Sequence, residues 1–141
     1  MGARRVDEAG LARLGADLAA GLRPPAVIAI TGELGAGKTT LVRAIARGLG
    51  VTEPVTSPTF ALVHRYEGAA TTVYHVDAYR LRRPAEADDL GLDDMAAEPR
   101  SVVLIEWPEK LGPRMPPATH HIALAYDPNP RFRRIDVGGP A

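Results

Sequence analysis

The stretch "GELGAGKTT", residues 32–40, lies between an apolar run and a segment with helical periodicity. The run before it, "AVIAIT" (residues 26–31), has the length and composition of a strand buried on both faces, as in a parallel sheet. After it, apolar residues recur at three- and four-residue intervals, at Leu41, Val42, Ile45 and Leu49. Gly48 or Gly50 would end such a helix. A strand, a glycine-rich loop and a helix are therefore expected in direct succession.

This arrangement matches the phosphate-loop pattern G-x-x-x-x-G-K-[ST], which begins at Gly32. Glycines allow successive backbone N–H groups to point at phosphate oxygens, and the start of the helix adds further N–H donors. We expect Lys38 to reach the β- and γ-phosphates of a bound nucleotide, Thr39 to bind Mg²⁺ and Thr40 to donate to the α-phosphate. The predicted nucleotide contacts in the loop are Glu33, Leu34, Gly35, Ala36, Gly37, Lys38, Thr39 and Thr40.

Two acids follow strand-like runs, and a phosphate-loop protein needs an acid for its metal ion. Glu106 comes directly after "VVLI", and Asp77 follows "TTVYHV". Both are expected at the carboxyl ends of strands, where open α/β sheets bind ligands. We favour Glu106 as the metal-side acid, because its apolar run predicts a central strand. Asp77 is expected to orient water or complete the metal shell, and His75 is interpreted as a structural histidine.

The remaining segments complete the predicted fold. Residues 7–22 place leucines at helical spacing after Asp7, a suitable N-cap. Residues 59–81 predict an antiparallel hairpin, with strands near 60–66 and 71–76. The other expected elements are a helical segment at 83–99 and strands at 101–106, 120–126 and 131–137. We therefore predict an α/β, P-loop NTPase-like fold in one domain, residues 1–141, with a mostly parallel central sheet, antiparallel additions and flanking helices.

The composition excludes several kinds of protein. The chain has 141 residues, no cysteine, and 17 basic and 17 acidic residues that cancel. Disulfides and thiolate metal sites are excluded, and strong non-specific binding of nucleic acid by the chain alone is disfavoured. Neither a long apolar run nor the apolar region of a signal peptide is found, so we expect a cytoplasmic protein with no membrane partner. Only Lys38 and Lys110 among the basic residues are lysines, which suggests that Lys38 does more than keep the surface charged.

Signature residues of two large P-loop classes are missing. GTPases need an N-K-x-D-type guanine reader, but Asn129 is the only asparagine and Pro130 follows it. The LSGGQ-like segment of an ABC-type ATPase is also missing. A small ATPase remains, as does a small-molecule kinase with "YRLRRPAEADD" as its lid. A non-enzymatic nucleotide-binding adaptor is disfavoured, because Lys38, Thr39 and Glu106 are intact.

Four segments occur in an order that resembles the bacterial TsaE (YjeE) family. They are "GELGAGKTTLVRAIARGLG", "VTSPTFALVHRYEG", "VYHVDAYRL" and "LIEWPEKLG". The resemblance covers residues 7–137. It implies a small Mg²⁺-dependent ATPase, required for forming N6-threonylcarbamoyladenosine at position 37 of tRNAs that read A-starting codons. It also implies TsaB and TsaD homologues as partners that stimulate a weak activity, with tRNA engaged only indirectly through that complex.

The resemblance also implies roles for particular residues. Lys38 and Thr39 would contact phosphate and Mg²⁺, Glu106 would be the second metal-side group, and Asp77 would be needed for ATP hydrolysis. Trp107 would lie near the nucleotide. Residues 57–60 would form a switch-like loop. From the residues themselves we expect Thr59 to face the γ-phosphate, with a plain structural turn as the alternative. The chain departs from the family pattern in two places: Glu33 replaces the usual Asp, and Leu11 replaces a Thr that helps seat the adenine.

Overall fold

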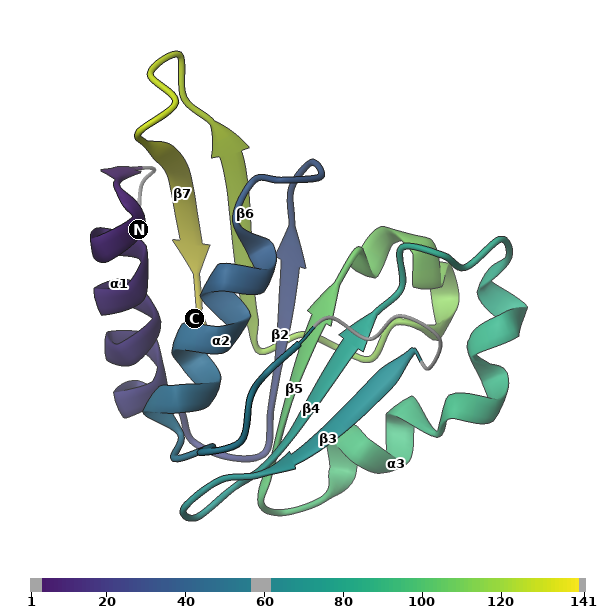
Figure 1. The fold of residues 1–141 in the computed structure, drawn as a ribbon. Coiled ribbons are helices and arrows are strands. Elements are labelled where there is room, and N and C mark those ends of the chain that lie inside the picture. Colours follow the sequence, from purple (N-terminus) through teal and green to yellow (C-terminus); the bar gives the residue numbers. More distant parts are fainter. Residues whose placement is uncertain (1–3, 57–61, 140–141) are drawn as a thin grey trace.

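The computed structural model describes residues 4–56 and 62–139. These residues form one seven-stranded sheet with helices on both faces (Figure 1). In chain order the elements are β1 (Arg4–Val6), α1 (Glu8–Gly21), β2 (Ala26–Thr31), α2 (Lys38–Gly48), β3 (Val63–Glu67), β4 (Thr72–Asp77), η1 (Pro84–Leu90), α3 (Leu92–Ala97), β5 (Ser101–Glu106), η2 (Pro108–Arg114), β6 (His120–Tyr126) and β7 (Arg133–Gly138), where η marks a 3₁₀ helix.

The sheet is parallel at its centre and antiparallel at its edges. The strand order is β1-β7-β6-β2-β5-β4-β3. Strand β2 pairs in parallel with β5 and β6, and β4 pairs in parallel with β5. The hairpin β3–β4 and the strands β7 and β1 add the antiparallel pairs. This confirms the predicted mixed α/β sheet, and it brings the carboxyl ends of β2, β4 and β5 to the same edge.

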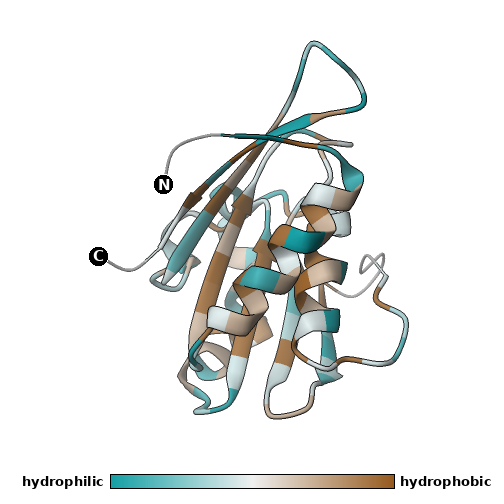
Figure 2. Cartoon of the chain, turned by 90° about the vertical axis from the view of Figure 1, so that its left-hand side faces the viewer, coloured by the Kyte–Doolittle hydropathy of each residue, from teal (hydrophilic) through white to brown (hydrophobic). Residues whose placement is uncertain are grey.

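The central strands are buried because helical layers cover both faces of the sheet. All six residues of β5 and five of the six in β2 are buried. Helices α1 and α2 pack on one face, while η1, α3 and η2 cover the other. Figure 2 shows long apolar stretches along the strands, whereas the helices alternate between apolar and polar residues. The apolar run that predicted β5 as a central strand thus reflects burial from both sides.

The helix before the phosphate loop begins as predicted and packs closely on the helix after it. Asp7 is the N-cap of α1, and its carboxylate accepts a hydrogen bond from the Gly10 N–H at 2.7 Å. Gly15 lies where α1 meets α2, and a Cβ atom there would be 2.4 Å from the Cβ of Ala44. A side chain at position 15 would therefore force the two helices apart. None of the helices in the described ranges is long and apolar enough to cross a bilayer.

Three details of the fold differ from the sequence prediction. The helical segment expected at 83–99 is two short helices, because Gly91 adopts a left-handed conformation between η1 and α3. Strand β1 was not predicted; it pairs with β7, and Asp127 binds Arg5 of β1 and Arg134 of β7. Strand β3 begins at Val63 and strand β7 at Arg133, each later than predicted. The first two residues of the predicted strand, 60 and 61, lie outside the described ranges.

Candidate active site

The loop between β2 and α2 takes a conformation that depends on glycine. Gly35 and Gly37 have φ angles of 78° and 101°, in the left-handed region that residues with side chains rarely adopt. A Cβ atom on Gly35 would also lie 2.7 Å from the hydroxyl oxygen of Tyr126. Gly37 is the N-cap of α2 and offers no side-chain cap. An anion at this end of α2 would therefore meet helix N–H groups and the positive end of the helix dipole.

The Lys38 side chain is buried beneath this loop. Its ammonium donates hydrogen bonds to the carbonyl oxygens of Gly32 and Glu33, at 2.5 and 2.7 Å. It also lies 4.5 Å from the centre of the Trp107 ring. Burial lowers the pKa of Lys38, although the acids around it, Glu106 first among them, act in the opposite direction. The two direct hydrogen-bond partners of the ammonium are neutral carbonyls, so an anion in the loop could replace them with a charged partner.

Two carboxylates face the start of α2 from neighbouring strands. Asp77 ends β4 and Glu106 ends β5, and the two residues are paired in the parallel register. Both oxygens of Glu106 lie near the Thr39 hydroxyl, at 3.4 and 3.5 Å. Asp77 accepts a hydrogen bond from the Tyr79 N–H at 3.0 Å, and burial raises its pKa. The sheet topology thus places an acid pair beside a helix N-terminus.

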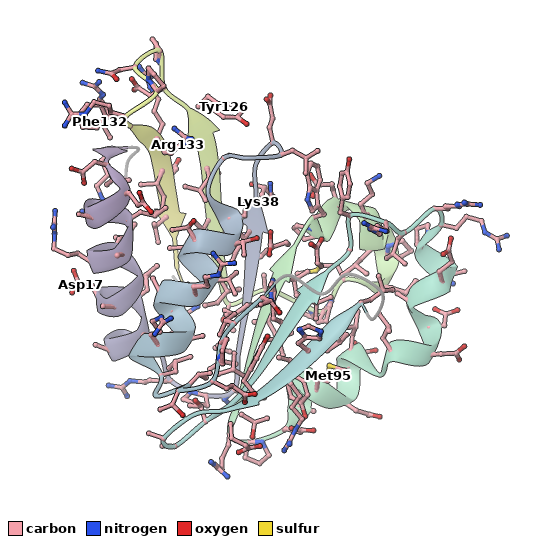
Figure 3. All side chains as sticks on the ribbon, viewed as in Figure 1. Asp17, Lys38, Met95, Tyr126, Phe132 and Arg133 are labelled. Atoms are coloured by element: carbon pink, nitrogen blue, oxygen red, sulfur yellow. The ribbon has the colours of Figure 1, made fainter. Side chains whose placement is uncertain are left out.

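A cavity of about 290 Å³ joins these groups. It is lined by Leu34, Gly35, Gly37, Lys38, Thr39, Thr40, Asp77, Tyr79, Glu106 and Trp107. A larger hollow of about 840 Å³ shares Gly35, Gly37 and Thr40 with it and extends toward α1 and the β6–β7 turn. Figure 3 shows Lys38 at the start of α2, with Tyr126 and Arg133 near the same end of the sheet. The two spaces suit a ligand with a phosphate end and a bulkier end.

Comparison with known proteins identifies the family. A family model described as "Threonylcarbamoyl adenosine biosynthesis protein TsaE" matches residues 6–135. The chain belongs to the TsaE family. A crystal structure titled as Bacillus subtilis YdiB covers 99% of this chain and 85% of its own, with a TM-score of 0.82 and 28% identity. The P-loop arrangement described above is therefore that of a TsaE-type fold.

Curated relatives support the assignment over most of the chain. A Nostoc protein named "tRNA threonylcarbamoyladenosine biosynthesis protein TsaE" is 39% identical over 124 residues, which cover 85% of this chain and 75% of the relative. A Streptomyces coelicolor protein of the same name is 48% identical over 99 residues, 68% of this chain and 66% of the relative. The Bacillus subtilis relative is 40% identical, and the match spans 60% of its length.

Most of the sequence-predicted site residues of this TsaE-family chain line the smaller cavity. Two loop residues do not: Ala36 is fully buried, and Glu33 faces a neighbouring hollow while its carbonyl binds Lys38. Thr59 and the rest of the 57–60 loop lie outside the described residues, so that prediction stays a prediction. Leu11, the departure from the family pattern, lines the larger hollow, and its Cδ2 is 3.2 Å from where a Cβ on Gly37 would lie.

Three residues at the site were missed by sequence reasoning. The ring of Tyr79 packs against Trp107, with centroids 5.0 Å apart, and Tyr126 donates a hydrogen bond to the Leu34 carbonyl. His75, interpreted as structural, has its Nε2 2.5 Å from Oε2 of Glu106. The alternation of a strand would have placed His75 and Asp77 on one face. No comparable signal links Tyr126 to the loop, because the two are 92 residues apart in sequence.

Trp107 should report nucleotide binding in this TsaE-family protein. Its backbone is left-handed, with φ 58° and ψ 49°, and its ring lies over the Lys38 ammonium. Phosphate that draws the ammonium away changes the charge beside the indole. We expect saturable fluorescence changes with Mg-ATP and Mg-ADP, and a smaller response in Lys38→Ala. The single tryptophan makes the signal unambiguous. A flat titration under conditions where calorimetry detects binding would contradict this placement.

Proposed function

We propose that this chain binds and hydrolyses ATP to support threonylcarbamoyladenosine formation at position 37 of tRNA, acting with TsaB and TsaD homologues. The observation that carries the proposal is the convergence of Lys38, Thr39, Asp77 and Glu106 on one cavity, in a chain of the TsaE family. Phosphate binding needs the lysine and the helix N-terminus, and hydrolysis needs an acid close to both. The names of the relatives support the tRNA modification pathway, and the residues that line the cavity support ATP binding and hydrolysis.

The loop and the buried lysine would position the triphosphate. Backbone N–H groups at the start of α2 would bind phosphate oxygens, and Lys38 would exchange its carbonyl partners for the β- and γ-phosphates. These donors are held by the fold before the ligand arrives, so little reorganisation is needed when negative charge moves to the leaving oxygen. The nucleoside would extend into the larger hollow, where Arg131 and Arg133 lie opposite the start of α1.

The donors beside Thr39 fit Mg²⁺. Magnesium prefers oxygen ligands and usually takes only one or two from protein, leaving the others to water and phosphate. The Thr39 hydroxyl and the Glu106 carboxylate provide such a pair. Among the described residues no cluster of three or more acids, histidines or cysteines forms a full metal cage, and an ion shared with phosphates requires none. When bound, Mg²⁺ would neutralise phosphate charge.

Asp77 would hold the attacking water. It stands beside Glu106 at the edge of the cavity, and its raised pKa makes it a better proton acceptor than an ordinary aspartate. The hydrogen bond from the Tyr79 N–H keeps one carboxylate oxygen fixed, so the other is available to water. Tyr79 and Trp107 border the same space and would limit access by bulk solvent.

Thr39 variants test the metal assignment. We expect Thr39→Val to raise the Mg²⁺ concentration for half-maximal ATP hydrolysis by about tenfold, because the hydroxyl ligand is lost. Thr39→Ser keeps the hydroxyl and should stay close to wild type. Magnesium titrations at saturating ATP measure the difference. Identical Mg²⁺ dependence in the valine and serine variants would contradict a role for this hydroxyl at the metal.

The partner assignment is tested with purified proteins. ATP hydrolysis should be weak for the chain alone and rise when a TsaB–TsaD complex is added.

Because the net charge is zero, the isolated chain should have negligible affinity for tRNA in a filter-binding or anisotropy assay at 150 mM salt. Tight, salt-sensitive tRNA binding by the chain alone would overturn the indirect role. Phosphorylation of an added metabolite would favour a small-molecule kinase instead.

A further inference from the structure

His75 makes a buried contact with the predicted metal-side acid. The imidazole is fully buried on β4, and its Nε2 lies 2.5 Å from Oε2 of Glu106 on β5. The ionised form of Glu106, which is the form that binds a metal ion, can only accept a hydrogen bond, and in that form Nε2 of His75 is the donor. The other nitrogen, Nδ1, is buried and has no hydrogen-bond partner among the described residues. Nδ1 is then an acceptor without a hydrogen. Leaving a buried acceptor unpaired costs less free energy than leaving a buried N–H unpaired, so the surroundings of Nδ1 agree with a hydrogen on Nε2.

The sheet register brings these two residues together. His75 pairs with Leu104, and Glu106 is the next residue of β5 on the same face. The contact is therefore diagonal across two parallel strands in the centre of the sheet, where the backbone is held by ladders on both sides. The His75 side chain therefore has few accessible rotamers. Its hydrogen bond in turn limits the rotamers of Glu106.

We propose that His75 is a positioning residue that orients Glu106 for Mg²⁺. The imidazole fixes Oε2, and this leaves the carboxylate turned so that both oxygens stay within 3.5 Å of the Thr39 hydroxyl. Without it, the Glu106 side chain would retain several rotamers beside a helix N-terminus and a buried lysine. Groups that hold a metal ligand in place commonly affect metal affinity by about 10- to 100-fold. This inference rests on the proposed Mg²⁺-dependent nucleotide site.

A role of His75 in packing alone predicts a different result for its variants. If His75 only fills space, an apolar residue of similar volume should serve as well, because its surroundings on β4 and β5 are the buried residues Val73 and Leu104. If it positions Glu106, what matters is a donor at the place of Nε2. Glutamine can bring its amide N–H close to that place, whereas leucine has the bulk without the donor, and asparagine has a donor on a shorter side chain.

The test compares nucleotide affinity with and without Mg²⁺ by calorimetry, together with Mg²⁺ titrations of ATP hydrolysis. We expect the ADP affinity of His75→Leu without Mg²⁺ to stay within about twofold of wild type. The Mg²⁺ concentration for half-maximal ATP hydrolysis should rise by about tenfold. His75→Gln should restore the wild-type dependence. His121→Leu, which removes an exposed imidazole from β6, is the matched control and should behave as wild type.

Each outcome decides the inference. A folded His75→Leu variant with wild-type Mg²⁺ dependence would overturn it while leaving the proposed function in place. A wild-type protein whose nucleotide affinity ignores Mg²⁺ would overturn the proposed metal site and this inference together. Should the leucine variant fail to fold, the glutamine and asparagine variants make the same comparison: Mg²⁺ dependence retained by glutamine and lost by asparagine supports positioning, and equal dependence in the two contradicts it.

Discussion

Lys38→Ala should lower kcat/KM for ATP on the order of a thousandfold, as expected when a preorganised charge at the transferred phosphate is removed. The fold should survive, because the loop conformation depends on its glycines. The carbonyls of Gly32 and Glu33 lose the Lys38 ammonium as a donor, but neither residue is buried, so water can take its place. Burial lowers the pKa of Lys38, which means that the charged ammonium is desolvated in the nucleotide-free protein. Alanine removes this unfavourable desolvation free energy. We therefore expect the melting temperature of the variant to match or exceed that of wild type.

Steady-state ATP hydrolysis with the partner complex, alongside thermal denaturation, measures both effects. The matched control is Lys110→Ala, since Lys110 is the other lysine of the chain and is exposed on η2. This control should keep near-wild-type activity. A folded Lys38→Ala protein that turns over ATP normally would remove the phosphate role from this lysine, and with it the main argument for the site.

The phosphate loop could be predicted because its determinants are contiguous in sequence. Residues 26–48 contain the strand, the glycines, the lysine and the helix, and the structure has β2 and α2 at the predicted positions. Each element depends on local pattern and on burial that the apolar run already indicates. The same holds for β5, whose six buried residues form the run that ends at Glu106.

The remaining site depends on neighbours that are distant in sequence. The pattern placed Asp77 and Glu106 each at a strand end, but only the sheet order pairs them and sets His75 beside Glu106. Strand β1 is three residues long, and one of its anchors is the ion pair between Arg5 and Asp127, 122 residues apart. A short charged segment has no local signal for a strand, so long-range pairing decides its structure.

The acid pair leads to the second large effect. Asp77→Asn should lower kcat by about 10² to 10⁴, the range expected when a general base or water-holding carboxylate is lost. The amide keeps an oxygen that can accept the Tyr79 N–H, so the local backbone should be preserved. ATP binding should change little, because the proposed phosphate contacts belong to the loop and α2. Single-turnover hydrolysis and calorimetric ATP binding, measured on the same preparation, separate the two steps.

The same substitution should stabilise the folded protein at neutral pH. Burial, followed by the charge of Glu106, raises the folded-state pKa of Asp77 above its ordinary value of 3.8, so the folded state binds this proton more tightly than the unfolded state. The cost of ionising Asp77 is absent below pH 3.8, grows as the pH rises through the folded-state pKa, and is complete above it. Asparagine avoids this cost at every pH.

The difference in melting temperature between Asp77→Asn and wild type should therefore increase as the pH rises. The variant should melt at a higher temperature than wild type at pH 8, and the gap should narrow as the pH falls toward 4. Thermal denaturation of both proteins across that range measures the gap, and changes in the rest of the chain cancel in the comparison. A variant less stable than wild type at pH 8, or a gap that does not change with pH, would contradict a half-buried carboxylate whose ionisation destabilises the folded state. Under the proposed function, Asp77 is kept at this cost in stability because its charge serves ATP hydrolysis. Loss of turnover in a variant that is more stable than wild type would show this trade-off directly.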